Sequence, residues 1–175
     1  PHWRGGAAAR DVIYRTVASG HQLLSGFTLL SRAKDSLEKL ESGKLTLREF
    51  NPNRTIFAGD SGPDERDMDY IGVDAQYFTV AYVPASGADS LKNFRRASAG
   101  IAADAALIPR HQERAVNTTF YLDSVVANVP PGASMRQELR LFAGPKQPDL
   151  LAEHGLEEAI YYGLPMFAFF SRLLG

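Results

Sequence analysis

Apolar and polar residues alternate with a period of two along much of this chain, which is the pattern of β-strands. Residues 12–18 (VIYRTVA) are rich in β-branched and aromatic side chains, and residues 76–83 (QYFTVAYV) are apolar on both faces. Further strands are expected at residues 45–50, 101–108, 118–129 and 135–143. The body is therefore predicted to be mainly β, an antiparallel β-sandwich of two packed sheets with a few short helices.

The segment 76–83 is expected to be a central strand, because a strand that is apolar on both faces must be covered on both sides. Phe78, Val80 and Tyr82 share one of its faces and are predicted to be largely buried. On this interpretation, Phe78→Ala would cost about 3–5 kcal/mol of stability, as other large-to-small changes in a core do.

Two other segments carry a helical period. A helix is predicted at 31–42, with Ser31 as its N-terminal cap and Gly43 ending it. Its apolar face is formed by Leu30, Ala33, Leu37 and Leu40. A second, short helix is predicted at 148–154, ended by Gly155.

Proline and glycine mark the connections. Residues 51–69 contain both, together with many acidic residues, and are predicted to form a long surface loop. Pro130-Pro131-Gly132 is predicted to be the turn between the strands at 118–129 and 135–143.

Residues 161–175 (YYGLPMFAFFSRLLG) are the most apolar stretch of the chain. The run 164–174 is too short to cross a bilayer, which takes about 20 apolar residues. We expect an amphipathic helix that lies in a membrane interface, with one broad apolar face: Tyr162, Met166, Phe167, Phe169, Phe170 and Leu173. A buried core helix is the alternative. The chain is thus divided into a β-sandwich domain at 1–155 and a helical tail at 156–175.

Composition narrows the classes of function. The chain has 19 basic and 20 acidic residues among 175, so it has no basic field that would bind nucleic acid. It contains no cysteine, which excludes disulfides and cysteine-ligated zinc. The four histidines show no i, i+4 pairing and no phosphate-binding glycine loop is present, so neither a metal nor a cofactor is expected. Since the chain begins at Pro1 rather than at methionine, we expect a fragment of a longer protein.

One short motif suggests catalysis. Gly59-Asp60-Ser61-Gly62-Pro63 is similar to the segment around the nucleophile of chymotrypsin-type serine proteases. That chemistry needs a histidine base beside the serine, and neither His2 nor His21 lies in the setting that this family uses. Turn chemistry accounts for such a segment, and the acids at 64–69 lack the spacing of a calcium loop. We therefore predict no catalytic residue and no enzyme.

Two further motifs carry a resemblance to a known family. Residues 70–78 (YIGVDAQYF), followed by an apolar strand that ends at Pro84, are similar to a passage of bacterial YidC membrane protein insertases. Val129-Pro130-Pro131-Gly132, then a strand that leads into residues 141–146 (LFAGPK), resembles a second passage. In that family a short helix, a Tyr-Gly segment and an amphipathic interfacial helix follow, ahead of a transmembrane helix. The corresponding elements occur here in the same order over residues 69–175.

The resemblance implies the large periplasmic domain of such an insertase, a β-supersandwich like that of galactose mutarotases. That domain is usually longer, so this chain would be its C-terminal part, and the lack of preceding strands would leave a sheet edge or an apolar face exposed. The implied role is non-enzymatic: insertase and chaperone support for proteins of the bacterial inner membrane, from the periplasmic side. Its implied partners are Sec translocon components, nascent membrane proteins and the membrane surface.

Two alternatives stay open. A secreted carbohydrate-binding or carbohydrate-active β-sandwich would share the mutarotase-like fold, but it needs a placed acid/base pair and usually sugar-stacking aromatics. The single tryptophan, Trp3, lies in a Gly/Ala-rich head, which argues against this class. A plain interaction module is the other alternative.

Overall fold

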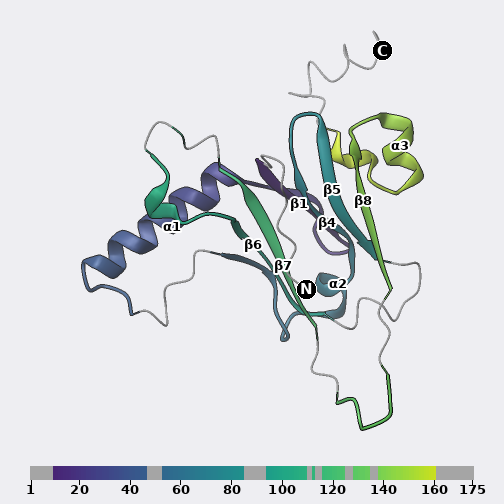
Figure 1. The fold of residues 1–175 in the computed structure, drawn as a ribbon, viewed down its shortest axis with the longest axis horizontal. Helices are drawn as coiled ribbons and strands as arrows, with labels where there is room; N and C mark the ends of the chain where they lie inside the picture. The colour runs from purple at the N-terminus through teal and green to yellow at the C-terminus, as the bar shows by residue number, and fades with distance from the viewer. Residues whose placement is uncertain are drawn as a thin grey trace.

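The structure, a computed structural model, describes residues 10–46, 53–84, 94–109, 112, 116–124, 128–134 and 138–160. Within these ranges, eight strands form two antiparallel sheets (Figure 1). The larger sheet has the order β2-β1-β4-β5-β8 and consists of β1 (Asp11–Thr16), β2 (Gly20–Ser25), β4 (Met68–Asp74), β5 (Phe78–Pro84) and β8 (Leu139–Pro145). The smaller sheet has the order β3-β6-β7 and consists of β3 (Arg54–Phe57), β6 (Phe94–Ile101) and β7 (Thr118–Ser124). The predicted mainly β, antiparallel sandwich is confirmed.

The helices of the described ranges are short apart from one. They are α1 (Gly26–Glu41), α2 (Pro63–Arg66) and α3 (Pro148–Glu153), with two single-turn 3-10 helices, η2 (Ala105–Leu107) and η3 (Glu157–Ala159). None of the helices in this part of the chain is both long enough and apolar enough to span a membrane.

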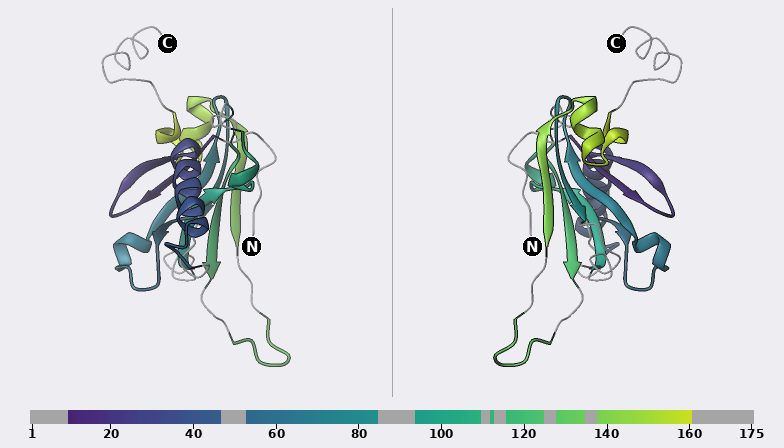
Figure 2. Two further views of the ribbon diagram at one scale, coloured as in Figure 1. Left: turned by 90° about the vertical axis from the view of Figure 1, so that its left-hand side faces the viewer. Right: turned by 90° about the vertical axis from the view of Figure 1, so that its right-hand side faces the viewer.

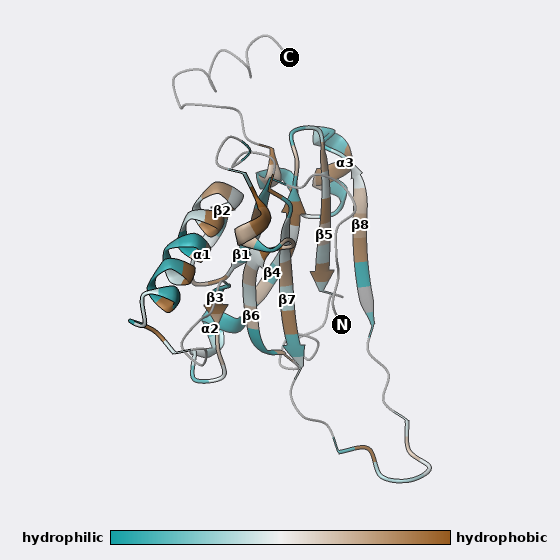
Figure 3. Ribbon diagram, turned by 60° about the vertical axis from the view of Figure 1, so that its left-hand side comes forward, coloured by the Kyte–Doolittle hydropathy of each residue, from teal (hydrophilic) through white to brown (hydrophobic). Residues whose placement is uncertain are grey.

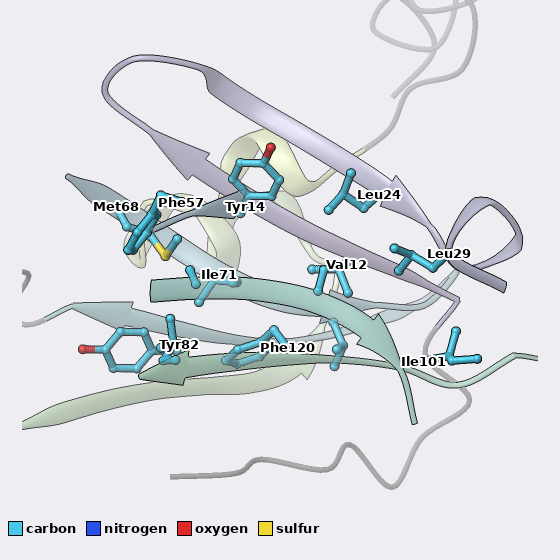
Figure 4. Packing of buried hydrophobic residues seen from close by; sticks show 14 of the residues in the cluster. Val12, Tyr14, Leu24, Leu29, Phe57, Met68, Ile71, Tyr82, Ile101 and Phe120 are labelled. Atoms are coloured by element: carbon cyan, nitrogen blue, oxygen red, sulfur yellow. The ribbon is translucent and has the colours of Figure 1, made fainter. Parts of the chain in front are cut away.

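The main core lies between the two sheets and beneath α1 (Figure 4). Val12 and Ile71 of the larger sheet meet Phe120 of the smaller sheet, and Leu29 of α1 closes one side. Hydrophilic and hydrophobic residues alternate along α1, as expected of a helix with one buried face (Figure 3).

A second core covers the opposite face of the larger sheet. Ile13, Tyr70 and Ala81 project to this side, where they pack against Leu151 of α3 and Leu156 ahead of η3. Figure 2 shows α3 and η3 on the side of the larger sheet away from the smaller one. β5 lies between β4 and β8, and the expectation that it is covered on both faces is confirmed around Ala81 and Tyr82, because Tyr82 belongs to the main core and Ala81 to the second.

The burial predicted for Phe78 is wrong. Tyr82 is buried and Val80 is partly buried, but the side chain of Phe78 is 57% exposed. The physical reason is the position of the smaller sheet, which packs against β1 and β4 through β7 and leaves this end of β5 uncovered. Leu141, which lies on the same face of the neighbouring strand β8 and opposite Tyr82, is 55% exposed. An apolar strip is thus exposed at the β5–β8 side of the larger sheet.

The predicted start of the first helix is also wrong. α1 begins at Gly26, directly after β2, and Ser31 lies inside it with its hydroxyl donating to the carbonyl of Phe27. Gly26 permits this early start because a Cβ there would lie 2.3 Å from the carbonyl oxygen of Arg10. The predicted end is confirmed, since Gly43 has a φ of 74° and its amide donates to Leu40.

Residues 51–69 do not form the uninterrupted loop that their composition predicts. β3 lies within them and pairs with β6, and its last residue, Phe57, is buried in the main core. α2 follows, and β4 begins at Met68. A strand of four residues between Pro52 and Gly59 is too short to show a clear period.

Several strand boundaries differ from those predicted. Residues 101–108 are the end of β6 and η2, because Asp104 Oδ1 accepts from the Ala106 amide at 3.0 Å and starts a helical turn. β7 ends at Ser124 and β8 begins at Leu139. The strand predicted at 45–50 lies mostly outside the described residues.

Two local predictions at the C-terminal side are confirmed. Pro130-Pro131-Gly132 forms the expected turn, with Gly132 at a φ of 86° and the Ala133 amide donating to Pro130 at 3.0 Å. α3 ends at Glu153 ahead of Gly155, whose φ is 69°, and the single-turn helix η3 follows.

The asymmetric cover of the larger sheet generates a prediction about stability. Ile71→Ala removes a fully buried side chain and should cost about 2–5 kcal/mol, whereas Phe78→Ala should cost less than about 1 kcal/mol because its side chain is already in contact with water. Urea unfolding of both variants measures the difference. Equal losses would mean that the exposed strip is covered in solution.

Candidate functional site

The residues predicted for the membrane-interface face lie outside the described residues, so their arrangement stays a prediction: Tyr162, Met166, Phe167, Phe169, Phe170 and Leu173. What the structure describes is the segment that leads up to them, residues 138–160, and its attachment to the larger sheet. This attachment is the candidate functional site.

A buried ion pair joins the two motifs that carry the family resemblance. Lys146 Nζ lies 2.8 Å from Asp74 Oδ2, and the two side chains are 12% and 9% exposed. The Lys146 amide also donates to the carbonyl of Tyr77 at 2.9 Å, just beyond the last residue of β8. The pair therefore holds the junction of β8 and α3 against the turn between β4 and β5.

Burial dominates the electrostatics of this pair. It raises the pKa of Asp74 above its ordinary value, while the hydrogen bond and the charge of Lys146 oppose the rise. This pair is not among the residues that the sequence patterns single out. The available signal was one charged residue inside each of two otherwise apolar or small-residue motifs, Asp74 in 70–78 and Lys146 in 141–146.

The helical segment after β8 is fixed to the sheet mainly by packing. Leu151 and Leu156 are fully buried, and the Leu156 amide donates to the carbonyl of Leu151 at 2.8 Å. Arg15 of β1 adds an ion pair to Glu158 of η3 at 3.1 Å, although both side chains are more than one-third exposed. Exposed pairs of this kind contribute at most about 1 kcal/mol, so burial of the leucines carries the attachment.

A polar contact lies beside this packing, on the same face of the sheet. Tyr70 is fully buried, and its hydroxyl hydrogen-bonds to Nδ1 of His21 on β2. Burial raises the pKa of the Tyr70 hydroxyl and lowers the pKa of His21, so both groups favour their neutral forms. The hydrogen bond therefore joins two neutral side chains on this face of the sheet.

A groove of about 780 Å³ runs along β8 on the side of α3. Residues 140–145 line its length, and Leu150, Glu153 and His154 form the wall contributed by α3. The ring of His154, which also lines the groove, packs on the ring of Phe142 with a centroid separation of 5.1 Å.

The protease-like motif forms a local turn. Ser61 Oγ accepts from the Ala58 amide at 3.1 Å, while His21 is engaged with Tyr70. Neither of these contacts joins Ser61 to His21 as a triad would require, and His2 lies outside the described residues. Within the described ranges, no three His, Asp or Glu side chains are grouped so that they could hold a metal ion.

Comparison with protein families matches residues 25–175 to the YidC periplasmic domain. The chain therefore belongs to the YidC periplasmic domain family, which is a class of periplasmic domains of bacterial membrane proteins and not a family of enzymes. The match begins at Ser25, so β1 and all but the last residue of β2 precede the matched residues. No curated protein and no solved structure matches the chain.

The buried pair generates a prediction with an internal control. Lys146→Met should cost about 3–5 kcal/mol at neutral pH, because it leaves the buried Asp74 carboxylate without its partner. Lys39→Met breaks a pair of the same types at 2.7 Å, but that pair is exposed and its loss should cost less than about 1 kcal/mol. Urea unfolding at pH 7 compares the two variants.

The pH dependence of the Lys146→Met variant follows from the raised pKa of Asp74. A carboxyl group whose pKa is higher in the folded state contributes stability that is present below the unfolded value of 3.8 and is lost as pH rises through the folded value. The loss in free energy of unfolding caused by Lys146→Met should therefore become smaller as the solution is made acidic. The loss caused by Lys39→Met should change less with pH. If the loss in free energy of unfolding were constant with pH, the substitution would act by removing the packing of the lysine stem and not its charge.

Proposed function

We propose that this domain belongs to a YidC-type insertase and chaperone that aids the insertion and folding of inner-membrane proteins, and that it acts by contact rather than by catalysis. The observation that carries the proposal is the family match over residues 25–175. The firm attachment of residues 148–160 to the larger sheet supports it, because this segment directly precedes the apolar tail.

The tail is the proposed contact with the membrane surface. Its proposed interfacial face consists of Tyr162, Met166, Phe167, Phe169, Phe170 and Leu173. An aromatic side chain that enters the headgroup region contributes about 1–2 kcal/mol, so two or three of them decide whether such a helix binds. A rigid attachment just before the helix would keep the β-sandwich in a fixed relation to the bilayer.

Sec translocon components and nascent membrane proteins are the proposed partners. Both are inferred from the resemblance to YidC insertases, which the family match over residues 25–175 supports. Contact rather than catalysis is the proposed mode of action because the matched family is not an enzyme family, and Ser61 is held in a local turn by the Ala58 amide.

The tail generates a testable prediction. Phe167→Asp combined with Phe170→Asp should abolish co-sedimentation of the protein with liposomes and leave the melting temperature nearly unchanged. The reason is that, in an interfacial helix, the two phenylalanines contact lipid and not a protein core. A matched control places the same charges on the polar edge of the predicted helix, as Ala168→Asp combined with Ser171→Asp, and should retain binding. A core helix would give the opposite: no lipid binding by the unmodified protein and a large drop in melting temperature in the first variant.

A further inference from the structure

β8 forms one edge of the larger sheet in the part of the chain that the structure describes. One side of it pairs with β5 over the full strand, from Phe78 opposite Pro145 to Pro84 opposite Leu139. No other strand of the described ranges pairs with its second side. An edge of this kind presents backbone groups that a further strand can bind.

The register identifies which backbone groups face outward. The Lys146 amide donates to Tyr77 across the β5–β8 ladder, and hydrogen-bonded residues alternate along an antiparallel pair. Residues 140, 142 and 144 therefore point their N–H and C=O groups toward β5, and Leu141 and Ala143 point theirs away. The backbone of Pro145 also points away from β5. An edge strand tolerates proline at such a position, because no hydrogen bond to the neighbouring strand is lost.

The surroundings of this edge are apolar where natural edges are usually protected by charge. Leu141 is 55% exposed on the face shared with Tyr82. The charged residue of the strand, Arg140, donates through its guanidinium to the carbonyl of Pro84 at 2.6 Å, and so turns toward β5. On the opposite face, Phe142 and Leu150 line the groove beside α3.

The groove lining contains one basic side chain, Arg140, which is hydrogen-bonded to the carbonyl of Pro84, and one acidic side chain, Glu153, on the wall formed by α3. Glu153 is exposed and forms no ion pair with any described residue. It lines the same groove as Leu150. A strand bound to β8 would point every second side chain toward this wall, where a basic side chain would complement the carboxylate and an apolar one would contact Leu150.

We propose that the groove between β8 and α3 binds an extended polypeptide segment, which pairs with Leu141 and Ala143 as an added strand and places a basic side chain beside Glu153. Its main chain supplies the affinity, and the pockets for alternate side chains supply the selectivity. The proposal stands on the sheet edge and the groove, so it does not depend on membrane binding by the tail.

The test uses a fluorescein-labelled nonapeptide of alternating valine and threonine with one central lysine, titrated with the protein and followed by fluorescence anisotropy. Saturable binding is expected. The same peptide with N-methyl groups on alternate residues should bind at least about tenfold more weakly, because it cannot form the ladder of hydrogen bonds. Equal binding of both peptides, or no saturable binding up to about 1 mM, would overturn the proposal.

Two variants locate the site. Leu141→Glu should weaken binding at least about tenfold, whereas Leu23→Glu should change it less than about twofold, since Leu23 is a similarly exposed leucine on the opposite edge strand, β2. If Leu141→Glu fails to fold, the N-methylated peptide against the unaltered protein still decides. Equal weakening by both variants would place binding elsewhere and contradict the proposal.

A charge reversal tests the role of Glu153. The unaltered protein should prefer the lysine peptide over its glutamate counterpart by about two- to fivefold, and Glu153→Lys should reverse that preference. An unchanged preference would remove Glu153 from the site and overturn the proposal as stated. Self-association of the protein without peptide, abolished by Leu141→Glu, would assign the edge to a second copy of the chain and also overturn it.

Discussion

The fold depends on one constraint: the larger sheet is apolar on both faces and must be covered on both. The smaller sheet and α1 cover one face, and the segment from α3 to η3 covers the other. Strands with apolar residues on both sides occur where layers stack in this way. The short helices after β8 are consequently part of the structural core rather than an appendage, because Leu151 and Leu156 contribute as fully buried residues.

The Asp74–Lys146 pair adds direction to this packing. Hydrophobic contact between a sheet and a short helix is not directional. It therefore does not define the position at which the helix begins. A buried charge pair with a required geometry does fix it, at an energetic cost of removing both charges from water. The chain leaves β8 at one defined point, and the position of everything after Lys146 follows from that point.

Sequence periodicity predicted the elements whose environment is the same along their length. β5 was found because residues 79–83 are covered on both faces, and α3 because Pro148 and Gly155 mark its ends. Phe78 was misjudged because its exposure depends on how far a different sheet extends, which no local pattern contains. β6 was missed because Arg95, Arg96 and small residues hide its period. The pairing of Asp74 with Lys146 could not be predicted, since it joins positions 72 residues apart through strand order.

The hairpin of β1 and β2 has a practical consequence for the boundaries of this domain. β1 lies between β2 and β4 in the larger sheet, and its Val12 and Ile13 are buried on opposite faces, yet it precedes the residues matched to the family. A protein trimmed to the family boundaries would lose this strand, and β4 would become an edge with two uncovered apolar surfaces beside it. Such a truncated domain would be prone to aggregate, so recombinant expression and domain-swap designs should retain the chain from at least Arg10, whose amide is bonded to Asp74.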